Sequence, residues 1–299
     1  MPNFEGHFKK VVILGAGGIV GQHLMMSEPS DEVVVKYARR TKVDGKRWWG
    51  VDVEDNNMVL DSLSFNGVFP DVVVNLAGEN RVDVVESNPK AYEAVNVNAP
   101  HTLAYQCQNR GIRFIQVSTQ GVFSGNDAPY SPYDKTNPIT EYGRQKASAE
   151  HVALQYGATV ARLTFVLGAR PFQDIGRRNP LEDMLEKPKQ LQVDDRWFSP
   201  CFAHDAAKVL WDEILKPKGE QIFHIGHPFG VTRYAVARDL VRGLHGALQT
   251  EVQPISHEYF SGLAQRPFNT KWAEGSRFYE DYETSLVTSF IQWKRYTGA

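Results

Sequence analysis

A tyrosine and a lysine four residues apart carry the clearest chemical signal in this sequence: Tyr142 and Lys146, in the run Tyr142-Gly143-Arg144-Gln145-Lys146. On a helix this spacing puts both side chains on one face. A nearby ammonium favours the phenolate and lowers the pKa of the phenol toward working pH. Tyr142 could then exchange a proton with a carbonyl or an alcohol. Because twelve tyrosines allow such a spacing by chance, its weight depends on where it falls in the chain.

Two hydroxyls close the strand-like run that precedes this pair. The run 113–118 ends at Ser118, and Thr119 follows, one strand–helix unit before Tyr142. One of these hydroxyls should project over the strand ends and hydrogen-bond a reacting carbonyl beside Tyr142. A hydroxyl at a strand end is more often a simple turn former. Only the partnership with Tyr142 and Lys146 favours a catalytic role.

Three glycines in the spacing G-x-x-G-x-x-G follow an apolar run, 11–14, and lead into a predicted helix over 19–26. This pattern aims free N–H groups and the positive end of the helix dipole at whatever lies above it. Glycine also lets the backbone approach a pyrophosphate closely. We therefore expect a nucleotide here, with an unliganded strand–helix junction as the alternative. The expected contacts are Gly15, Gly18, Ile19, Val20 and Gly21.

Two arginines, Arg39 and Arg40, follow the second predicted strand. An NAD-preferring site usually places an acid there for the ribose hydroxyls, and the residues 37–42 supply none. Arginine suits the 2′-phosphate of NADP, so we expect NADPH rather than NADH; a solvated basic turn is the alternative. Asp52 and Val53, after the third predicted strand, should lie beside the adenine, unless Asp52 merely caps the next helix.

Valine-rich runs alternate with helix-like stretches through the first two-thirds of the chain. Such continuous apolar runs are typical of strands buried on both faces, and hence of a parallel sheet flanked by helices. The predicted strands are 11–14, 32–37, 47–53, 71–78, 113–118, 159–163 and 221–225. They predict an α/β fold with a doubly wound parallel sheet (Rossmann), whose ligands bind beyond the carboxyl ends of the strands.

The pattern loosens after residue 168, where the stretches 169–200 and 249–278 look irregular. We therefore expect a dinucleotide-binding domain over 1–168. The remainder, 169–299, should be mainly a smaller, irregular α/β substrate-binding lobe, with segments near 200–245 returning to the main domain.

Composition excludes several other classes of protein. The chain of 299 residues is 42% hydrophobic and 23% charged, as in soluble globular proteins, and a formal charge of −2 gives no hint of nucleic-acid or membrane affinity. It shows neither a signal sequence nor a membrane span, so we expect a cytoplasmic protein. Cys107 and Cys201 are too few for a disulfide framework, and nine scattered histidines predict no metal site.

Taken together, these motifs resemble the extended short-chain dehydrogenase/reductase superfamily. The glycine triplet, the run Asn75-Leu76-Ala77-Gly78, Ser118-Thr119 and Tyr142-x-x-x-Lys146 carry that resemblance. Further runs are similar to the dTDP-4-dehydrorhamnose reductases: 82–89, 94–97, 118–125, 142–146 and 266–270. The likeness covers most of the chain and is strongest over 11–168. Homodimers are common in the superfamily, so a homodimer is one possibility.

The resemblance implies roles by position. Thr119 would polarise the substrate carbonyl, Tyr142 would donate the proton, and Lys146 would hold the nicotinamide ribose and tune Tyr142. The cofactor would also contact Leu76, Ala77, Gly78, Val117, Tyr142 and Lys146. The expected substrate contacts are Asn80, Val82, Thr119, Phe165, Arg196 and Arg266, although Phe165 could equally pack in the core. Further candidates for the substrate's pyrophosphate are Arg170, Arg177 and Arg178.

The family typically reads Ser-Thr-Asp-Tyr where this chain has Ser118-Thr119-Gln120-Gly121. The missing acid argues against dehydration of a sugar and leaves the sugar's identity open. We expect an enzyme: an NADPH-dependent reductase of the keto group of a nucleotide-linked 4-keto-6-deoxy sugar. One alternative is an NAD(P)-dependent nucleotide-sugar epimerase, against which the two arginines count. Another is a non-catalytic NADP-binding regulatory subunit, although such proteins tend to lose the Thr–Tyr–Lys set.

Overall fold

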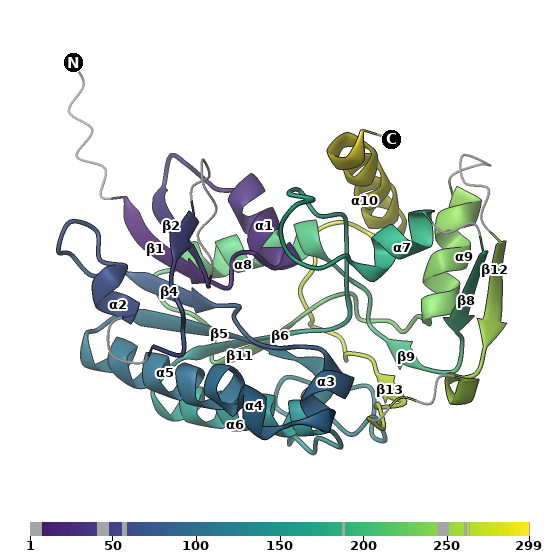
Figure 1. The fold of residues 1–299 in the computed structure, drawn as a ribbon, viewed down its shortest axis with the longest axis horizontal. Helices are drawn as coiled ribbons and strands as arrows, with labels where there is room; N and C mark the ends of the chain where they lie inside the picture. The colour runs from purple at the N-terminus through teal and green to yellow at the C-terminus, as the bar shows by residue number, and fades with distance from the viewer. Residues whose placement is uncertain are drawn as a thin grey trace.

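Seven parallel strands form one sheet at the centre of the computed structural model (Figure 1). The model describes residues 8–40, 48–55, 59–186, 189–243, 251–259, 262 and 264–298. The order of the strands across the sheet is β3-β2-β1-β4-β5-β6-β11. Their bounds are β1 Lys9–Leu14, β2 Val33–Arg39, β3 Trp48–Gly50, β4 Val72–Asn75, β5 Arg113–Thr119, β6 Thr159–Leu163 and β11 Ile222–Ile225. All neighbouring pairs are parallel, which confirms the predicted doubly wound sheet.

Alternate residues of β1 point to opposite faces of this sheet and enter separate cores. Val11 and Ile13 pack with α1 (Ile19–Met26) and α8 (Ala203–Leu215). Val12 and Leu14 pack on the other face, against a core to which α5 (Ala99–Asn109) contributes. Helix α6 (Glu141–Gln155) covers the same face as α5 (Figure 1). Burial on both faces explains why the strands are runs of valine and isoleucine rather than alternating patterns.

Most predicted strands differ from the observed ones only at their ends. The strand 159–163 and the helix 19–26 have the predicted bounds. The strand expected over 47–53 is seen at Trp48–Gly50, and Arg47 lies outside the described residues. Smaller helical segments complete this part: α2 Val59–Ser62, α3 Val82–Ser87, α4 Lys90–Glu93, a π-helical turn Ala94–Asn98 and a 3₁₀ turn Gln120–Val122.

The second part of the chain is more regular than its sequence suggests. Three two-stranded parallel pairs join β7 to β10, β8 to β12 and β9 to β13. Their bounds are β7 Val166–Leu167, β8 Lys189–Val193, β9 Trp197–Phe198, β10 Cys201–Phe202, β12 Glu251–Ile255 and β13 Asn269–Thr270. The stretches expected to be irregular, 169–200 and 249–278, contain β8, β9, β12 and β13, separated by described segments without regular structure such as 171–179. β8 and β12 are polar strands that pair across some sixty residues of sequence, so neither has a local signal.

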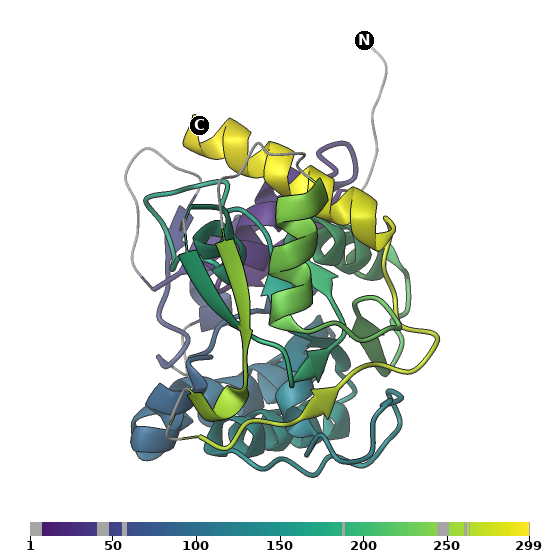
Figure 2. The ribbon, with the colours of Figure 1, turned by 90° about the vertical axis from the view of Figure 1, so that its right-hand side faces the viewer.

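Helices cover this smaller region on one side. Figure 2 shows α9 beside the β8–β12 pair, with α10 lying across the top of the molecule. The bounds are α7 Pro180–Glu186, α9 Arg233–Gly243, α10 Tyr282–Thr297 and a 3₁₀ turn His257–Tyr259. A core of its own, with Phe202, Leu240, Phe290 and Trp293, joins these helices. None of the helices in the described part of the chain is both long and apolar enough to cross a membrane.

Candidate active site

The first two turns of α6 bring the tyrosine and the lysine to the end of β5. Thr140 caps the helix, its Oγ1 accepting from the N–H of Gly143 at 3.0 Å. Tyr142 lies in the first turn and Lys146 one turn later, as their spacing predicts. A hydrogen bond joins the side chains of Tyr142 and Thr119, the last residue of β5. The cap thus fixes where the phenol meets the strand end.

Lys146 is held between α6 and β5. Its side chain is 6% exposed, and Nζ donates to the carbonyl of Val117 at 2.9 Å. Burial lowers the pKa of Lys146 to about 8, against an opposing contribution from the Glu150 carboxylate. A lysine near its pKa at neutral pH can remain charged and yet respond to small changes in its surroundings.

The pKa of Tyr142 is shifted in the direction opposite to the expected one. Burial raises the pKa of Tyr142 to about 12, although the hydrogen bond from Thr119 acts the other way. The predicted lowering of this pKa is therefore wrong for the ligand-free protein, because desolvation of the phenolate dominates. The consequence is a phenol that stays protonated at neutral pH. That state suits a group that donates a proton rather than one that removes it.

These two shifts predict the pH dependence of the reaction. Below pH about 8 Lys146 is an ammonium, and above it the charge is lost as the folded-state pKa is passed. Tyr142 keeps its proton up to pH about 12. We expect kcat/KM for NADPH to be level at neutral pH and to fall above pH about 8. This parameter reports the cofactor-free protein, so initial rates over a pH series measure it. A profile without a basic limb would show that the ammonium is not needed.

An asparagine that the sequence reading did not single out links the catalytic helix to the loop after β4. Asn96 is fully buried in the π-helical turn. Its Oδ1 accepts from the N–H of Glu79 at 2.9 Å, and its Nδ2 donates to Oε1 of Gln145 at 2.8 Å. Single π turns are frequent at functional sites, but no periodicity in the sequence reveals one. Asn96 therefore fixes the spacing between α6 and the loop that holds Gly78.

The glycine turn is packed so closely that no side chain can be added at two of its glycines, Gly15 and Gly21. Gly15 has φ +73°, and a Cβ there would lie 2.4 Å from the backbone N of Ala77. A Cβ on Gly21 would lie 2.5 Å from Cα of Ala16. Gly18 precedes α1 as its N-cap, so the N–H groups of Ile19 and Val20 begin the helix. The turn has the open, donor-rich backbone that a pyrophosphate requires.

The predicted cofactor contacts Leu76, Ala77 and Gly78 come directly after β4 and lie beside the end of β1. Leu76 donates its N–H to the carbonyl of Leu14 at 2.9 Å, and the N–H of Ala77 donates to Oδ1 of Asn75 at 3.1 Å. Gly78 comes next, and a Cβ there would approach Oδ1 of Asn96 at 3.0 Å. The loop therefore lies against the glycine turn.

Arg39 and Arg40 have different surroundings. The Arg39 Nε lies 3.5 Å from where a Cβ on Gly17 would sit, so this side chain reaches over the glycine turn. Arg40 is 78% exposed and pairs with Asp52, its Nε 3.3 Å from Oδ2. Val53, the residue after Asp52, is buried. Of the two arginines, Arg39 lies at the carboxyl end of β2 beside the glycine turn, which is where an NADP site holds the 2′-phosphate.

Changing Arg39 to alanine should therefore separate the two nicotinamide cofactors. A charge-assisted bond to a 2′-phosphate contributes about 1.5–3 kcal/mol, so the affinity for NADPH should fall about 10- to 100-fold. The affinity for NADH should change little. Titration of each cofactor, with Arg40→Ala as the matched control, measures both. An equal loss for NADPH and NADH would contradict the assignment.

A cleft of about 890 Å³ opens beside Thr119 and Tyr142. Val82 and Phe165 line it, so Phe165 is not confined to the core; its ring also packs on Phe198, with ring centres 5.1 Å apart. Asn80 is not among the described residues that line the cleft; its side-chain oxygen accepts from Arg177 at the exposed edge.

Three arginines converge on this cleft: Arg196, Arg266 and Arg233. Burial, followed by the charge of Arg266, lowers the pKa of both Arg196 and Arg233. Arg266 pairs with Asp83, whereas Nε of Arg196 and of Arg233 makes no hydrogen bond to any described residue. Cations held close together with too few counter-charges form a site for an anion.

Sequence reasoning named two of these three arginines and missed Arg233. It begins α9, and its sequence neighbourhood looks like an ordinary helix start. Three other candidates lie elsewhere. Arg170 is buried in an ion pair with Glu182, and Arg178 pairs with two carboxylates on the surface. Arg177 contacts the loop after β4.

Comparison with known proteins places this geometry in a family. The family model described as the RmlD substrate binding domain matches residues 9–287. A dTDP-4-keto-6-deoxy-D-glucose reductase of Streptomyces niveus is 28% identical over 294 residues, covering 93% of this chain and 96% of the relative. Methionine adenosyltransferase 2 subunit beta of Mus musculus is 29% identical over 273 residues, covering 88% and 80%. The dTDP-4-dehydrorhamnose reductase of Bacillus anthracis, solved with NADP, has the same fold, with a TM-score of 0.81 at 19% identity over 95% and 99% of the chains.

Proposed function

This chain belongs to the family described as the RmlD substrate binding domain, and we propose that it is an NADPH-dependent reductase of the keto group of a nucleotide-linked 4-keto-6-deoxy sugar. The observation that carries the proposal is the meeting of Thr119 and Tyr142 beside an arginine-lined cleft, with Lys146 one helical turn from Tyr142 and bonded to β5. The glycine turn supports NADPH as the cofactor, because its glycines leave the backbone uncovered and the side chain of Arg39 reaches over it.

Side chains of this protein bind the keto oxygen and donate the proton to it. NADPH, when bound, supplies a hydride to the keto carbon. The hydroxyls of Thr119 and Tyr142 hydrogen-bond the keto oxygen, and Tyr142 gives its proton to that oxygen as it becomes an alkoxide. The Lys146 ammonium stabilises the phenolate left on Tyr142 and offers its remaining N–H groups to the nicotinamide ribose. Oxygen gains the proton and carbon gains the hydride, so a ketone becomes an alcohol.

Two alternatives remain to be separated from this one. One relative is named as a subunit of another enzyme, methionine adenosyltransferase 2 subunit beta, so a non-catalytic, NADP-binding regulatory subunit is the first alternative; against it, this chain keeps the Thr119 hydroxyl, the Tyr142 phenol and the Lys146 ammonium. An epimerase would use the same groups, but Arg39 favours NADPH, which is consumed, over a cofactor that is retained. NADPH oxidation with a set of nucleotide-linked 4-keto-6-deoxy sugars decides: binding without consumption would favour the regulatory role.

Arg233 should hold the anionic part of the substrate. Changing Arg233 to glutamine removes one buried cation, which should raise KM for the nucleotide sugar about tenfold or more and change kcat little. Arg178→Gln is the matched control, since that arginine pairs with Asp183 and Glu186 on the surface. Steady-state rates at saturating NADPH measure both. If the wild type and Arg233→Gln had equal KM values, the diphosphate of the substrate would bind away from Arg233.

Assembly and location stay predictions. A homodimer, allowed by the resemblance, is tested by the mass of the protein in solution. The cytoplasmic location expected from the sequence is tested by fractionation of the source cells.

A further inference from the structure

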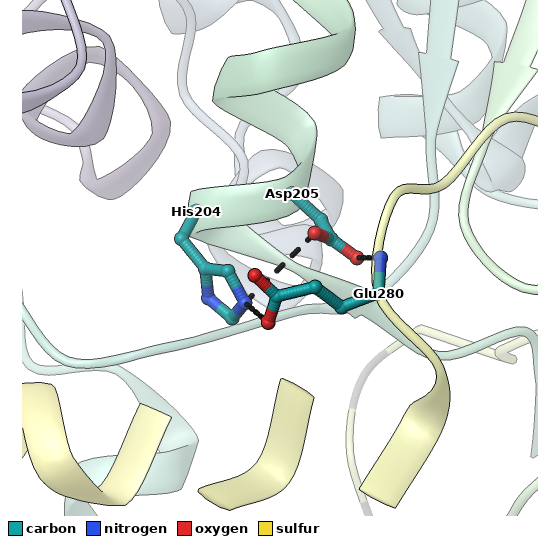
Figure 3. Close-up of side chains that lie close together, drawn as sticks. All are labelled: His204, Asp205 and Glu280. Carbon is teal, nitrogen blue, oxygen red and sulfur yellow. Dashed lines mark hydrogen bonds and ion pairs between the residues drawn. The ribbon is translucent and has the colours of Figure 1, made fainter. Parts of the chain in front are cut away.

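A histidine and two carboxylates meet where α8 begins and the segment before α10 passes it (Figure 3). His204 and Asp205 lie in the first turn of α8, and Glu280 comes from the chain just before α10. One ligand atom from each residue lies within 4.8 Å of the other two. The three residues are not among the described residues that line the cleft, so the reductase chemistry does not account for them.

The spacing of these atoms suits a single small cation. His204 Nε2 is 3.4 Å from Oε2 of Glu280 and 3.9 Å from Oδ1 of Asp205. Ligands about 2.0–2.2 Å from a tetrahedral zinc ion are separated by about 3.3–3.6 Å. The observed separations are at or slightly above that range, so a small inward movement of Asp205 would close the site.

The cluster is buried but not satisfied by hydrogen bonds. His204 is 5% exposed and Asp205 is 2% exposed. Within the described part of the chain, Nδ1 of His204 and Oδ1 of Asp205 have no hydrogen-bond partner, and Nε2 of His204 has only the 3.4 Å contact with Oε2 of Glu280 (Figure 3). Unpaired polar atoms are costly in a protein interior, and most buried ones are paired. Burial also lowers the pKa of His204, which favours the neutral imidazole that a metal binds.

The other oxygens of the two carboxylates are already fixed. Oδ2 of Asp205 accepts from the N–H of Glu280 at 3.4 Å and from Ser285 Oγ at 3.3 Å. Oε1 of Glu280 accepts from Nζ of Lys208 at 2.7 Å. Such outer bonds hold ligand oxygens in place, and metal sites generally have them. Oε2 of Glu280, which faces the histidine, also accepts from Oγ1 of Thr288 at 3.0 Å, whereas Oδ1 of Asp205 faces the histidine with no hydrogen-bond partner among the described residues.

We propose that His204, Asp205 and Glu280 bind one divalent transition-metal ion of the Zn²⁺ class, which fastens the start of α10 to α8. The imidazole favours zinc over magnesium, whose ligands are oxygen atoms. A water molecule would complete four ligands. The scattered histidines of the sequence gave no sign of this site, because Glu280 joins the pair only in the folded chain. The proposal differs from the prediction of no metal site, and the experiment below distinguishes the two.

Metal-free, untagged protein should take up one Zn²⁺ per chain, and its Tm should rise with Zn²⁺ and return on adding EDTA. Calorimetric titration gives the stoichiometry, and Co²⁺ in place of Zn²⁺ should produce the visible absorption of a four-coordinate site. Glu280→Gln should weaken binding at least about tenfold, because it loses a charged ligand on a partly exposed residue that leaves the fold intact.

His151→Gln is the matched control, since that exposed histidine on α6 faces Gln155 and no carboxylate cluster. It should bind Zn²⁺ like the wild type. His204→Gln should lose binding, and a circular dichroism spectrum will show whether that variant folds. Equal affinities for wild type and Glu280→Gln, or uptake of less than one ion per chain, would overturn the proposal. His204 would then be an imidazole that interacts with Glu280 alone.

Discussion

Tyr142→Phe is expected to lower kcat/KM about 10³-fold while leaving NADPH binding almost unchanged. The variant keeps the ring that lines the cleft and removes only the proton that the alkoxide must receive. General acid catalysis by a positioned side chain contributes about 10²–10⁴-fold, so the loss should lie in that range. Initial rates and a fluorescence titration with NADPH measure the two quantities separately.

Tyr133→Phe is the matched control for this change. Tyr133 is 79% exposed and is not among the described residues that line the cleft, so this change removes a tyrosine hydroxyl away from the site. It should leave kcat/KM as in the wild type. If Tyr142→Phe retained more than about a tenth of the activity, another group would have to supply the proton.

Gly15→Ala is expected to unfold much of the protein or to destroy its cofactor site. The new Cβ would lie 2.4 Å from the backbone N of Ala77, and the residue has φ +73°. Neither β1 nor β4 can move, because both are central strands of the sheet. We expect the free energy of unfolding to fall by more than about 3 kcal/mol. Chemical denaturation and NADPH titration of the folded fraction measure the effect.

Gly111→Ala separates the effect of the positive φ from the effect of the close contact with Ala77. Gly111 has φ +67°, but a Cβ there would meet no described atom within 4 Å. This variant should lose only the cost of a left-handed alanine, about 1–2 kcal/mol. If both variants lost the same free energy, the contact with Ala77 would not matter, and the close approach of the loop to the glycine turn would lose its support.

The local parts of the site could be predicted from the sequence, because each rests on a short pattern. A buried run of valines specifies a central strand, and three glycines after it specify the turn that approaches Ala77. The four-residue spacing of Tyr142 and Lys146 needs only a helix. The resemblance to dTDP-4-dehydrorhamnose reductases was confirmed for the same reason, since its motifs are contiguous.

What could not be predicted depends on contacts between distant segments. Arg233 and Arg196 meet only because α9 and β9 fold onto one cleft. The raised pKa of Tyr142 follows from burial in the folded chain, which the spacing of residues in the sequence does not reveal. Asn96 lies in a π-helical turn, and β8 pairs with β12 across some sixty residues that include α8, β11 and α9. Each of these is a property of the packed chain rather than of any short stretch.

Deuterium transfer from labelled NADPH shows directly whether this protein reduces a keto sugar. The protein is given NADPH that carries deuterium at the transferable position, together with a nucleotide-linked 4-keto-6-deoxy sugar, and the product is examined by mass spectrometry and NMR. We expect one deuterium on the former keto carbon and one NADP⁺ formed for each alcohol. A product without deuterium, or an isomerised sugar with no net loss of NADPH, would contradict it.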